Sequence, residues 1–263
     1  MIVCADDYGL RADVDQAILA LAGSRRLTAV SCMAALERCD GDLLARLRAH
    51  EANVDIGLHL CFTHEPLALE GRLKAAAGSR RLPTCGQLVR QSFMGGLAPK
   101  AVAWQIAVQY DLFVAKCGRK PDFLDGHLHV HQLPGIRAGL IEFLAELPVA
   151  VRPYVRNTGM PLRRLWAHRL PWAKAAFICP FGRRLARELK AASLVTNEGF
   201  AGIYDFRRWP RYPEYLPRFA ACLTTPNGIL VTHQGQEEDW RRQEFEALRG
   251  HGLAAARLNR FLL

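Results

Sequence analysis

The sequence of 263 residues predicts an α/β fold in which about seven parallel strands form a distorted barrel. Short apolar runs alternate along the chain with segments of helical apolar spacing, and this alternation gives parallel sheets with right-handed crossovers. The number of strand candidates is close to the eight of a regular β/α barrel. No internal repeat or linker-like tract interrupts the pattern, so we expect one domain over residues 1–263.

The first half of the chain shows the alternation most clearly. Strand 54–62 places Asp55, Gly57, His59 and Cys61 on one face, because side chains alternate along a strand. Glycine and proline punctuate residues 64–100, which we expect to form a surface excursion. The expected strands are 2–5, 27–34, 54–62 and 123–131, and the expected helices are 14–21, 42–49, 87–93, 101–116 and 136–147.

The second half is less regular. Residues 160–192 have helical spacing but are broken by Pro161, Pro171 and Pro180. Further strands are expected over 149–152, 200–204 and 228–233, and further helices over 217–223, 237–249 and 253–261.

The composition is that of a soluble globular protein, with 50% hydrophobic and 23% charged residues. No run of 18 apolar residues predicts a membrane span, and the first residues lack the features of a signal peptide. A cytoplasmic location is therefore expected. The eight cysteines are scattered without a Cys-x-x-Cys pair, so we expect reduced thiols rather than a zinc knuckle.

The charge is strongly basic, at +10, and it is unevenly distributed. Residues 149–187 contain no Asp or Glu but many arginines, together with Trp166, Trp172, Phe177 and Phe181. This stretch is either a solvated basic face or a surface that attracts an anionic partner, including a membrane contacted peripherally. No zinc-finger, homeodomain-like or RNA-binding signature is present, so no nucleic-acid partner is expected.

Two carboxylates, Asp6 and Asp7, directly follow the first apolar run. Isolated buried charges are costly, and the carboxyl ends of parallel strands form the usual active-site rim of such folds. The pair therefore indicates a functional site. The alternative is a capping Asp ahead of the first helix with a solvated neighbour.

Histidines follow the later strands. His59 lies on the third expected strand, where a satisfied core histidine is the alternative. The block from Asp125 contains His127, His129 and His131, which would share one face of an extended strand about 7 Å apart. That spacing predicts that one histidine binds the metal and that another supports this ligand or contacts the substrate. The alternative is a polar edge strand.

His233 ends another apolar strand, so five side chains follow strand ends that meet at one edge of the fold. A carboxylate with two imidazoles suits Zn²⁺ and other divalent cations, here Zn or Mg. Such an ion activates water and polarises a carbonyl, which amide hydrolysis needs together with a base and an acid.

These residues resemble the YdjC-like carbohydrate deacetylases, a family that includes chitooligosaccharide deacetylases and hopanoid-biosynthesis-associated deacetylases. The resemblance rests on the motifs beginning at Ala5, Gly57, Asp125 and Val151, in this order and over most of the chain. It implies a distorted β/α barrel of the polysaccharide-deacetylase type.

The resemblance also implies roles. Asp7, His59 and His127 match the metal ligands, Asp6 the base and His233 the acid that protonates the amine. Arg152 is expected to orient Asp6 or bind substrate, and Asp125, His129 and His131 to support the site or contact substrate. The chain departs from the pattern at Gln234, where relatives often have proline, and at Cys61, where a polar residue is usual.

The expected activity is removal of an N-acetyl group from a glucosamine-type sugar, either a soluble oligosaccharide or a lipid-linked sugar. A phosphoesterase on the same scaffold is the alternative, because the same ligand types serve phosphate esters. The other expected partner is a second copy of the chain in a homodimer.

Overall fold

The fold is seen in a computed structural model that describes residues 1–63, 82–206, 211–253, 255 and 257. Within these residues, seven parallel strands form one sheet in the order β5-β4-β3-β2-β1-β7-β6. The strands are β1 (Ile2–Tyr8), β2 (Ala29–Cys32), β3 (Asp55–Leu60), β4 (Phe123–Gly126), β5 (Tyr154–Val155), β6 (Phe200–Ala201) and β7 (Ile229–Thr232).

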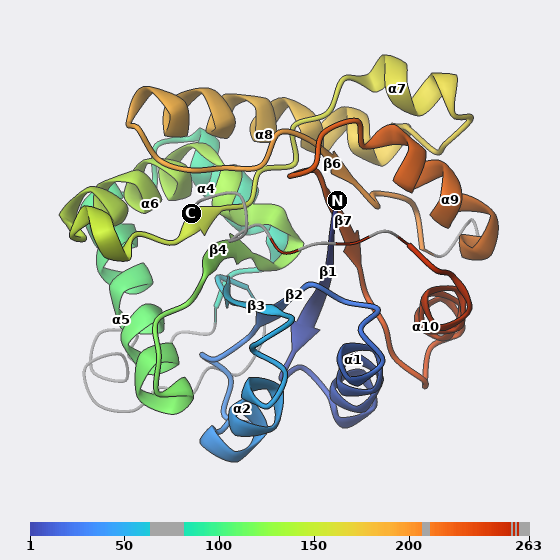
Figure 1. Ribbon diagram of the computed structural model, residues 1–263. Coiled ribbons are helices and arrows are strands. Elements are labelled where there is room, and N and C mark those ends of the chain that lie inside the picture. The colour runs from blue at the N-terminus through green and yellow to red at the C-terminus, as the bar shows by residue number, and fades with distance from the viewer. Residues whose placement is uncertain (64–81, 207–210, 254, 256, 258–263) are drawn as a thin grey trace.

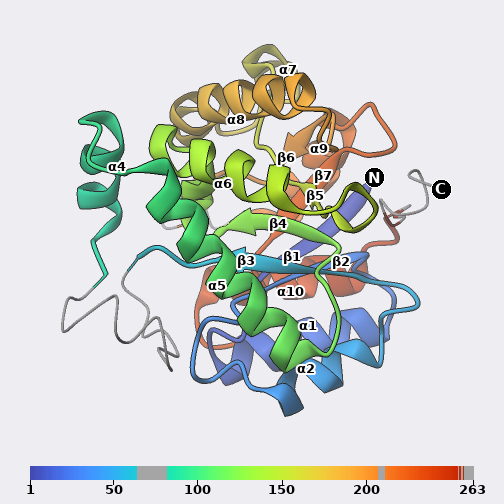
Figure 2. The same cartoon turned by 90° about the vertical axis from the view of Figure 1, so that its left-hand side faces the viewer.

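Helices surround this sheet (Figures 1 and 2), so every residue of every strand is buried. The α-helices are α1 (Ala12–Gly23), α2 (Gly41–Arg48), α4 (Cys85–Phe93), α5 (Pro99–Cys117), α6 (Pro134–Glu146), α7 (Leu162–Ala167), α8 (Ala173–Ala191), α9 (Tyr212–Cys222) and α10 (Asp239–Gly250). The expected distorted barrel of about seven strands is thus confirmed. None of the described helices is long and apolar enough to cross a bilayer.

Local sequence signals explain several helix ends. Asp40 caps α2 by accepting from the backbone N–H of Leu43, and Thr84 forms a capping box with Gln87 at α4. Helix α5 begins at Pro99, and Gly118 follows its last residue in the left-handed conformation that glycine adopts readily.

Asparagine side chains, rather than a full strand ladder, join the two edges of the sheet. Beyond one parallel bridge between Val155 and Thr196, Asn157 donates to the Thr196 hydroxyl at 2.8 Å and to the Asn197 carbonyl at 2.7 Å. Asn197 in turn donates to the Asn157 carbonyl at 3.0 Å and accepts from its N–H at 2.8 Å. These bonds curl the sheet into a nearly closed barrel.

Replacing Asn157 by Ala is expected to lower the free energy of unfolding by about 3 kcal/mol, because buried partners lose their hydrogen bonds without gaining water. Urea unfolding followed by circular dichroism measures this change. The same substitution at the exposed Asn53 is the control and is expected to cost less than about 0.5 kcal/mol. Equal stabilities for the two variants would contradict the role of Asn157 in closing the barrel.

A bulge shapes the end of β1. Ala5 pairs with Val30 and Tyr8 with Cys32, so β1 carries one residue more than β2 over this stretch. Asp7 lies in the left-handed region at φ 71°, and the bulge lets two consecutive carboxylates face the same region of the barrel. The capping alternative is wrong, because Arg11 holds the N-cap position of α1.

The structure differs from the sequence-based expectation for the fourth and fifth strands, and a third expected element cannot be compared. The expected strand 123–131 ends at Gly126, and the 3₁₀ segment η1 (His127–Gln132) follows, with Leu128 and His129 in the left-handed region. Residues 149–152 include a 3₁₀ turn, η2 (Val149–Val151), and the fifth strand lies just after them. The helix expected over 253–261 falls largely outside the described residues.

Candidate active site

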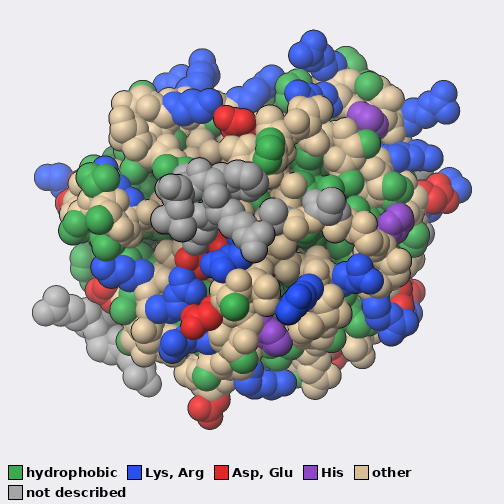
Figure 3. Space-filling model, viewed as in Figure 1, with side chains coloured by type: hydrophobic (Ala, Val, Ile, Leu, Met, Phe, Trp, Pro, Cys, Tyr) green, Lys and Arg blue, Asp and Glu red, His purple; other side chains and the backbone are tan. Residues whose placement is uncertain are grey.

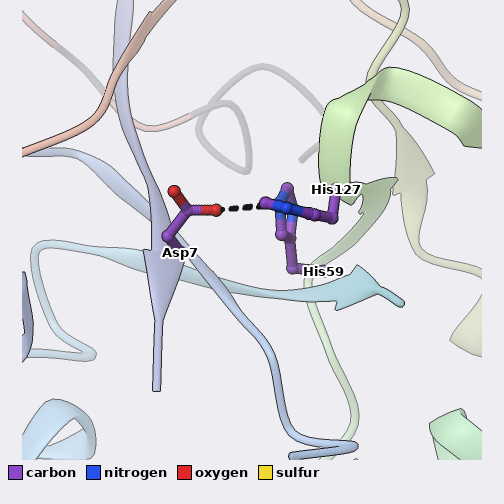
Figure 4. A group of neighbouring side chains, drawn as sticks. All are labelled: Asp7, His59 and His127. Carbon is purple, nitrogen blue, oxygen red and sulfur yellow. Dashed lines mark hydrogen bonds and ion pairs between the residues drawn. The ribbon is translucent and has the colours of Figure 1, made fainter. Parts of the chain in front are cut away.

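Three side chains from different strand ends meet in one group. Asp7 at the end of β1, His59 in β3 and His127 directly after β4 point toward one another (Figure 4). An Asp7 carboxylate oxygen, Oδ1, lies 3.0 Å from Nδ1 of His127 and 3.5 Å from Nε2 of His59. One ligand atom from each of the three residues falls within 4.8 Å of the others, which is the spacing of a shared cation.

Groups behind His59 fix its orientation. Its Nδ1 lies 2.6 Å from Asp125 Oδ1, and Ser31 donates to the same oxygen at 2.5 Å. With Nδ1 held by a carboxylate, Nε2 faces Asp7 and is the ring nitrogen available to a cation, as in histidines that bind metals in proteins. Burial acts to lower the pKa of His59, but Asp125 and Asp6 outweigh it and raise that pKa to about 10. A cation at Nε2 must displace this proton.

Asp6 lies beside this triad and forms an ion pair with Arg156. The guanidinium donates to both carboxylate oxygens of Asp6, at 2.5 Å and 2.7 Å, and also lies 2.9 Å from Asp125. Both Asp6 and Arg156 are buried. Burial raises the pKa of Asp6, and the charges of Arg156 and His59 offset this only in part. Cys4, Asp6 and Asp125 also lie close together, but Arg156 already supplies their cation.

The arginine that orients Asp6 is not the one expected from the sequence. Arg152 donates to the carbonyls of Leu147 and Ala145 at the end of α6, so it does not orient Asp6. Arg156, the first residue after β5, does so instead. The residue sits at a strand end like the other site residues, but the expected strand was placed too early to show it.

His233 faces Asp6 from the end of β7. Its Nε2 lies 3.8 Å from Asp6 Oδ2, and its ring packs against Phe206 and Trp240 at centroid distances of 5.2 Å and 6.2 Å. Burial and the cations Arg241, Lys174 and Arg156 lower its pKa well below the usual range, against the attraction of Asp7. The ring is therefore neutral at neutral pH.

The other two histidines of the block leave the strand direction. Because Leu128 and His129 have positive φ, His127, His129 and His131 do not share one strand face, and the predicted 7 Å ladder is wrong. His131 is buried, with Nε2 2.8 Å from the Arg156 carbonyl, and burial lowers its pKa to about 4. It thus supports the arginine that holds Asp6. His129 meets Phe200 edge-on at 5.6 Å.

Two residues of α10 complete the site, and sequence reasoning missed both. Arg241 donates to Asp7 Oδ2 at 2.8 Å, and buried Glu244 accepts from the His233 N–H and the Tyr204 hydroxyl, each at 2.6 Å. They lie on a helix three residues apart, and nothing in that spacing distinguishes them from an ordinary charged helix face. Arg241 and Glu244 hold the proposed ligand Asp7 and the backbone of His233 in place.

Glu244 is expected to make the free energy of unfolding depend on pH. Burial raises its pKa from 4.5 to about 7, although bonds from Tyr204 and His233 oppose the shift. Between these two values the folded protein keeps a proton that the unfolded chain releases, so this group lowers stability as pH rises from about 4.5 to 7. The stability of the wild type relative to Glu244→Gln is therefore expected to fall across this window, by up to about 3 kcal/mol. Urea unfolding at several pH values checks this, and a constant difference would contradict it.

The charges of the buried site residues favour a bound cation. Three buried carboxylates, Asp6, Asp7 and Asp125, face two buried guanidiniums, Arg156 and Arg241, so the group carries one net negative charge once His59 has lost the proton described above. Bonds from His127 and His59 and the charge of Arg241 overcome the effect of burial and hold the pKa of Asp7 well below its usual range. An ionised carboxylate beside two imidazoles is a suitable donor set for a divalent ion.

Comparisons with known proteins agree with this architecture. The sequence profile of the family described as YdjC-like protein matches residues 1–257. A curated relative from Escherichia fergusonii, named chitooligosaccharide deacetylase, is 28% identical over 153 residues, which is 58% of this chain and 58% of that protein. The matched region thus spans little more than half the length of the relative.

A solved structure shares the fold. The crystal structure of an Enterococcus faecalis protein, described provisionally as a cellobiose-phosphate cleavage protein, aligns with a TM-score of 0.67 at 16% identity. The alignment covers 95% of this chain and 90% of that one. This likeness supports the barrel architecture over the aligned part of the chain.

Proposed function

The chain belongs to the YdjC-like protein family, and from this we propose that it is a metal-dependent hydrolase that removes the N-acetyl group of an amino sugar. The observation that carries the proposal is the triad of Asp7, His59 and His127 next to Asp6, a carboxylate held by Arg156. A glucosamine-type oligosaccharide is the proposed substrate, in keeping with the name of the curated relative.

A divalent cation, Zn²⁺ or Mg²⁺, would be held by Asp7, His59 and His127, and when bound it would polarise the amide carbonyl and acidify water. The buried Asp6, whose pKa is raised, is the proposed base that takes a proton from the attacking water. Arg156 keeps both oxygens of Asp6 in a fixed orientation.

The second proton transfer is assigned to His233. The amine leaves only after protonation, and His233 Nε2 lies 3.8 Å from Asp6 Oδ2. A proton accepted by Asp6 therefore has a short route to His233 and from there to the amine nitrogen. Because burial and neighbouring cations lower the pKa of His233, its protonated form gives up this proton more readily than an ordinary imidazolium.

Mass spectrometry on a panel of N-acetylated glycans and glycolipids tests the proposal. Protein loaded with zinc or magnesium is expected to remove one acetyl group from at least one glucosamine-type substrate, and the chelated protein is expected to remove none. Phosphate esters in the same panel test the phosphoesterase alternative. Hydrolysis of phosphate esters without any loss of acetyl groups would contradict the proposed function.

A further inference from the structure

Large apolar side chains gather on one part of the surface. Six of the nine exposed large hydrophobic residues in the described chain lie on α4, η1, α7 and the start of α8, and are 48–70% exposed. Phe93 of α4 contacts Phe181 of α8 at a ring-centroid distance of 5.8 Å, and Trp166 of α7 contacts Trp172, just before α8, at 6.0 Å. Within α8, Phe177 contacts Phe181 at 5.6 Å. We call these seven residues the aromatic rim: Phe93, Met94, Leu128, Trp166, Trp172, Phe177 and Phe181.

The aromatic rim borders the candidate active site. Leu128 directly follows His127, and α4 and α8 both pack against η1, which carries these two residues. Lys174, in the first turn of α8, places its ammonium 4.1 Å from the Phe206 ring, and Phe206 packs against His233. Clustered exposed apolar side chains are uncommon on proteins without a partner, and they mark interaction surfaces.

The charge around the aromatic rim is predominantly positive. Residues 82–110 and 149–187, which contain α4, α7 and most of α8, include no Asp or Glu. Exposed cations lie in the same two segments: Arg90, Lys100, Arg163, Arg169 and Lys174. Figure 3 shows Lys and Arg side chains projecting along the upper edge, where α7 and α8 lie in Figure 1. The partner of this surface must therefore be negatively charged and must accept apolar side chains.

We propose that the aromatic rim docks the protein on an anionic lipid bilayer, with its rings at the depth of the headgroups and its cations on lipid phosphates. A second copy of the chain fits less well, because two faces rich in cations repel each other. A nucleic acid also fits less well. The rings meet edge to face, at 64–88°, and so do not form the parallel platforms on which bases stack.

Docking in this orientation would hold His127 and its neighbours in η1 close to the membrane surface. This proposal goes beyond the proposed chemistry and does not depend on it, because it concerns binding alone. The Asp6→Asn protein is expected to bind vesicles as the wild type does, so a failure of the catalytic assignment leaves the docking test intact.

Sedimentation of the full chain with vesicles tests the proposal. Binding is expected to vesicles of phosphatidylcholine with phosphatidylglycerol, to be much weaker with phosphatidylcholine alone, and to weaken with salt. The double variants Phe93→Ser/Phe177→Ser and Trp166→Ser/Trp172→Ser should each lower the partition coefficient about tenfold or more. The matched control Val149→Ser/Val195→Ser, which also removes exposed apolar side chains, should change it less than about twofold.

Brominated lipids give a second readout, since they should quench tryptophan fluorescence of the wild type but not of Trp166→Ser/Trp172→Ser. The proposal is overturned by equal binding to neutral and anionic vesicles, or by rim variants that bind like the control. It is also overturned if the rim variants abolish a dimer or oligonucleotide binding and leave vesicle binding unchanged.

Discussion

Replacing Asp6 by Asn is expected to lower the rate of acetate release by about 10³-fold while the protein stays folded. Asparagine keeps the shape of the side chain, and its one oxygen still accepts a bond from Arg156, which remains paired with Asp125. The amide has no basic oxygen, however, so the proton of the attacking water has no acceptor. General base catalysis is typically worth 10²–10⁴ in rate, which sets the expected size of the loss.

Steady-state kinetics on the best substrate of the panel measure this effect, and zinc titration of the same variant separates it from metal loss. Asp55→Asn is a matched control, because Asp55 is another buried carboxylate, pairs with Arg257, and lies at the start of β3, away from the strand ends that carry the site. It should keep its activity within a few-fold, as expected for a residue remote from the chemistry. Full activity in Asp6→Asn would remove Asp6 from the role of base.

The order of strands and helices was predictable because apolar runs and helical spacing are strong signals in a parallel α/β fold. The convergence of Asp6, Asp7, His59 and His127 followed from one rule, that strand ends share an edge of the sheet. The bulge at Asp7 was not predictable, since a residue with positive φ is rare outside glycine and its neighbours impose the conformation.

The His127–His131 block shows where periodicity fails. Alternation of histidines and apolar residues is typical of a strand, but the ladder to β3 ends at Gly126 and the chain turns. Leu128 and His129 then adopt left-handed conformations that their side chains do not favour, so tertiary packing and not local preference sets this turn. The alternation of histidines and apolar residues therefore does not predict this turn.

Arg156 was missed for a different reason. The motif Val-Arg-Pro-Tyr-Val-Arg offers two arginines, and the family resemblance was placed on the first, at the end of the strand expected over 149–152. Pro153 precedes the observed strand, as a residue without a backbone N–H often does, and this was the available signal. With the strand placed after Pro153, the strand-end rule would have selected Arg156.

The proposed metal ligand His127 is the second residue whose loss is expected to have a large effect. His127→Ala should raise the dissociation constant for zinc at least about 100-fold and lower activity about 10⁴-fold at limiting metal. His127 is the most exposed member of the triad, with 17% of its side chain accessible. Its removal is therefore expected to leave the barrel packing intact, unlike the removal of the buried His59.

Isothermal titration with zinc, together with activity at a fixed free-metal concentration, measures both effects, and His168→Ala serves as a histidine control outside the triad. The affinity of the wild type should also rise with pH by up to about tenfold per unit below pH 10, because zinc displaces the proton that Asp125 and Asp6 hold on His59. His127→Ala should keep this slope, since His59 and its partners are unchanged. Zinc affinity and activity equal to the wild type in His127→Ala would show that the cation does not bind at this triad.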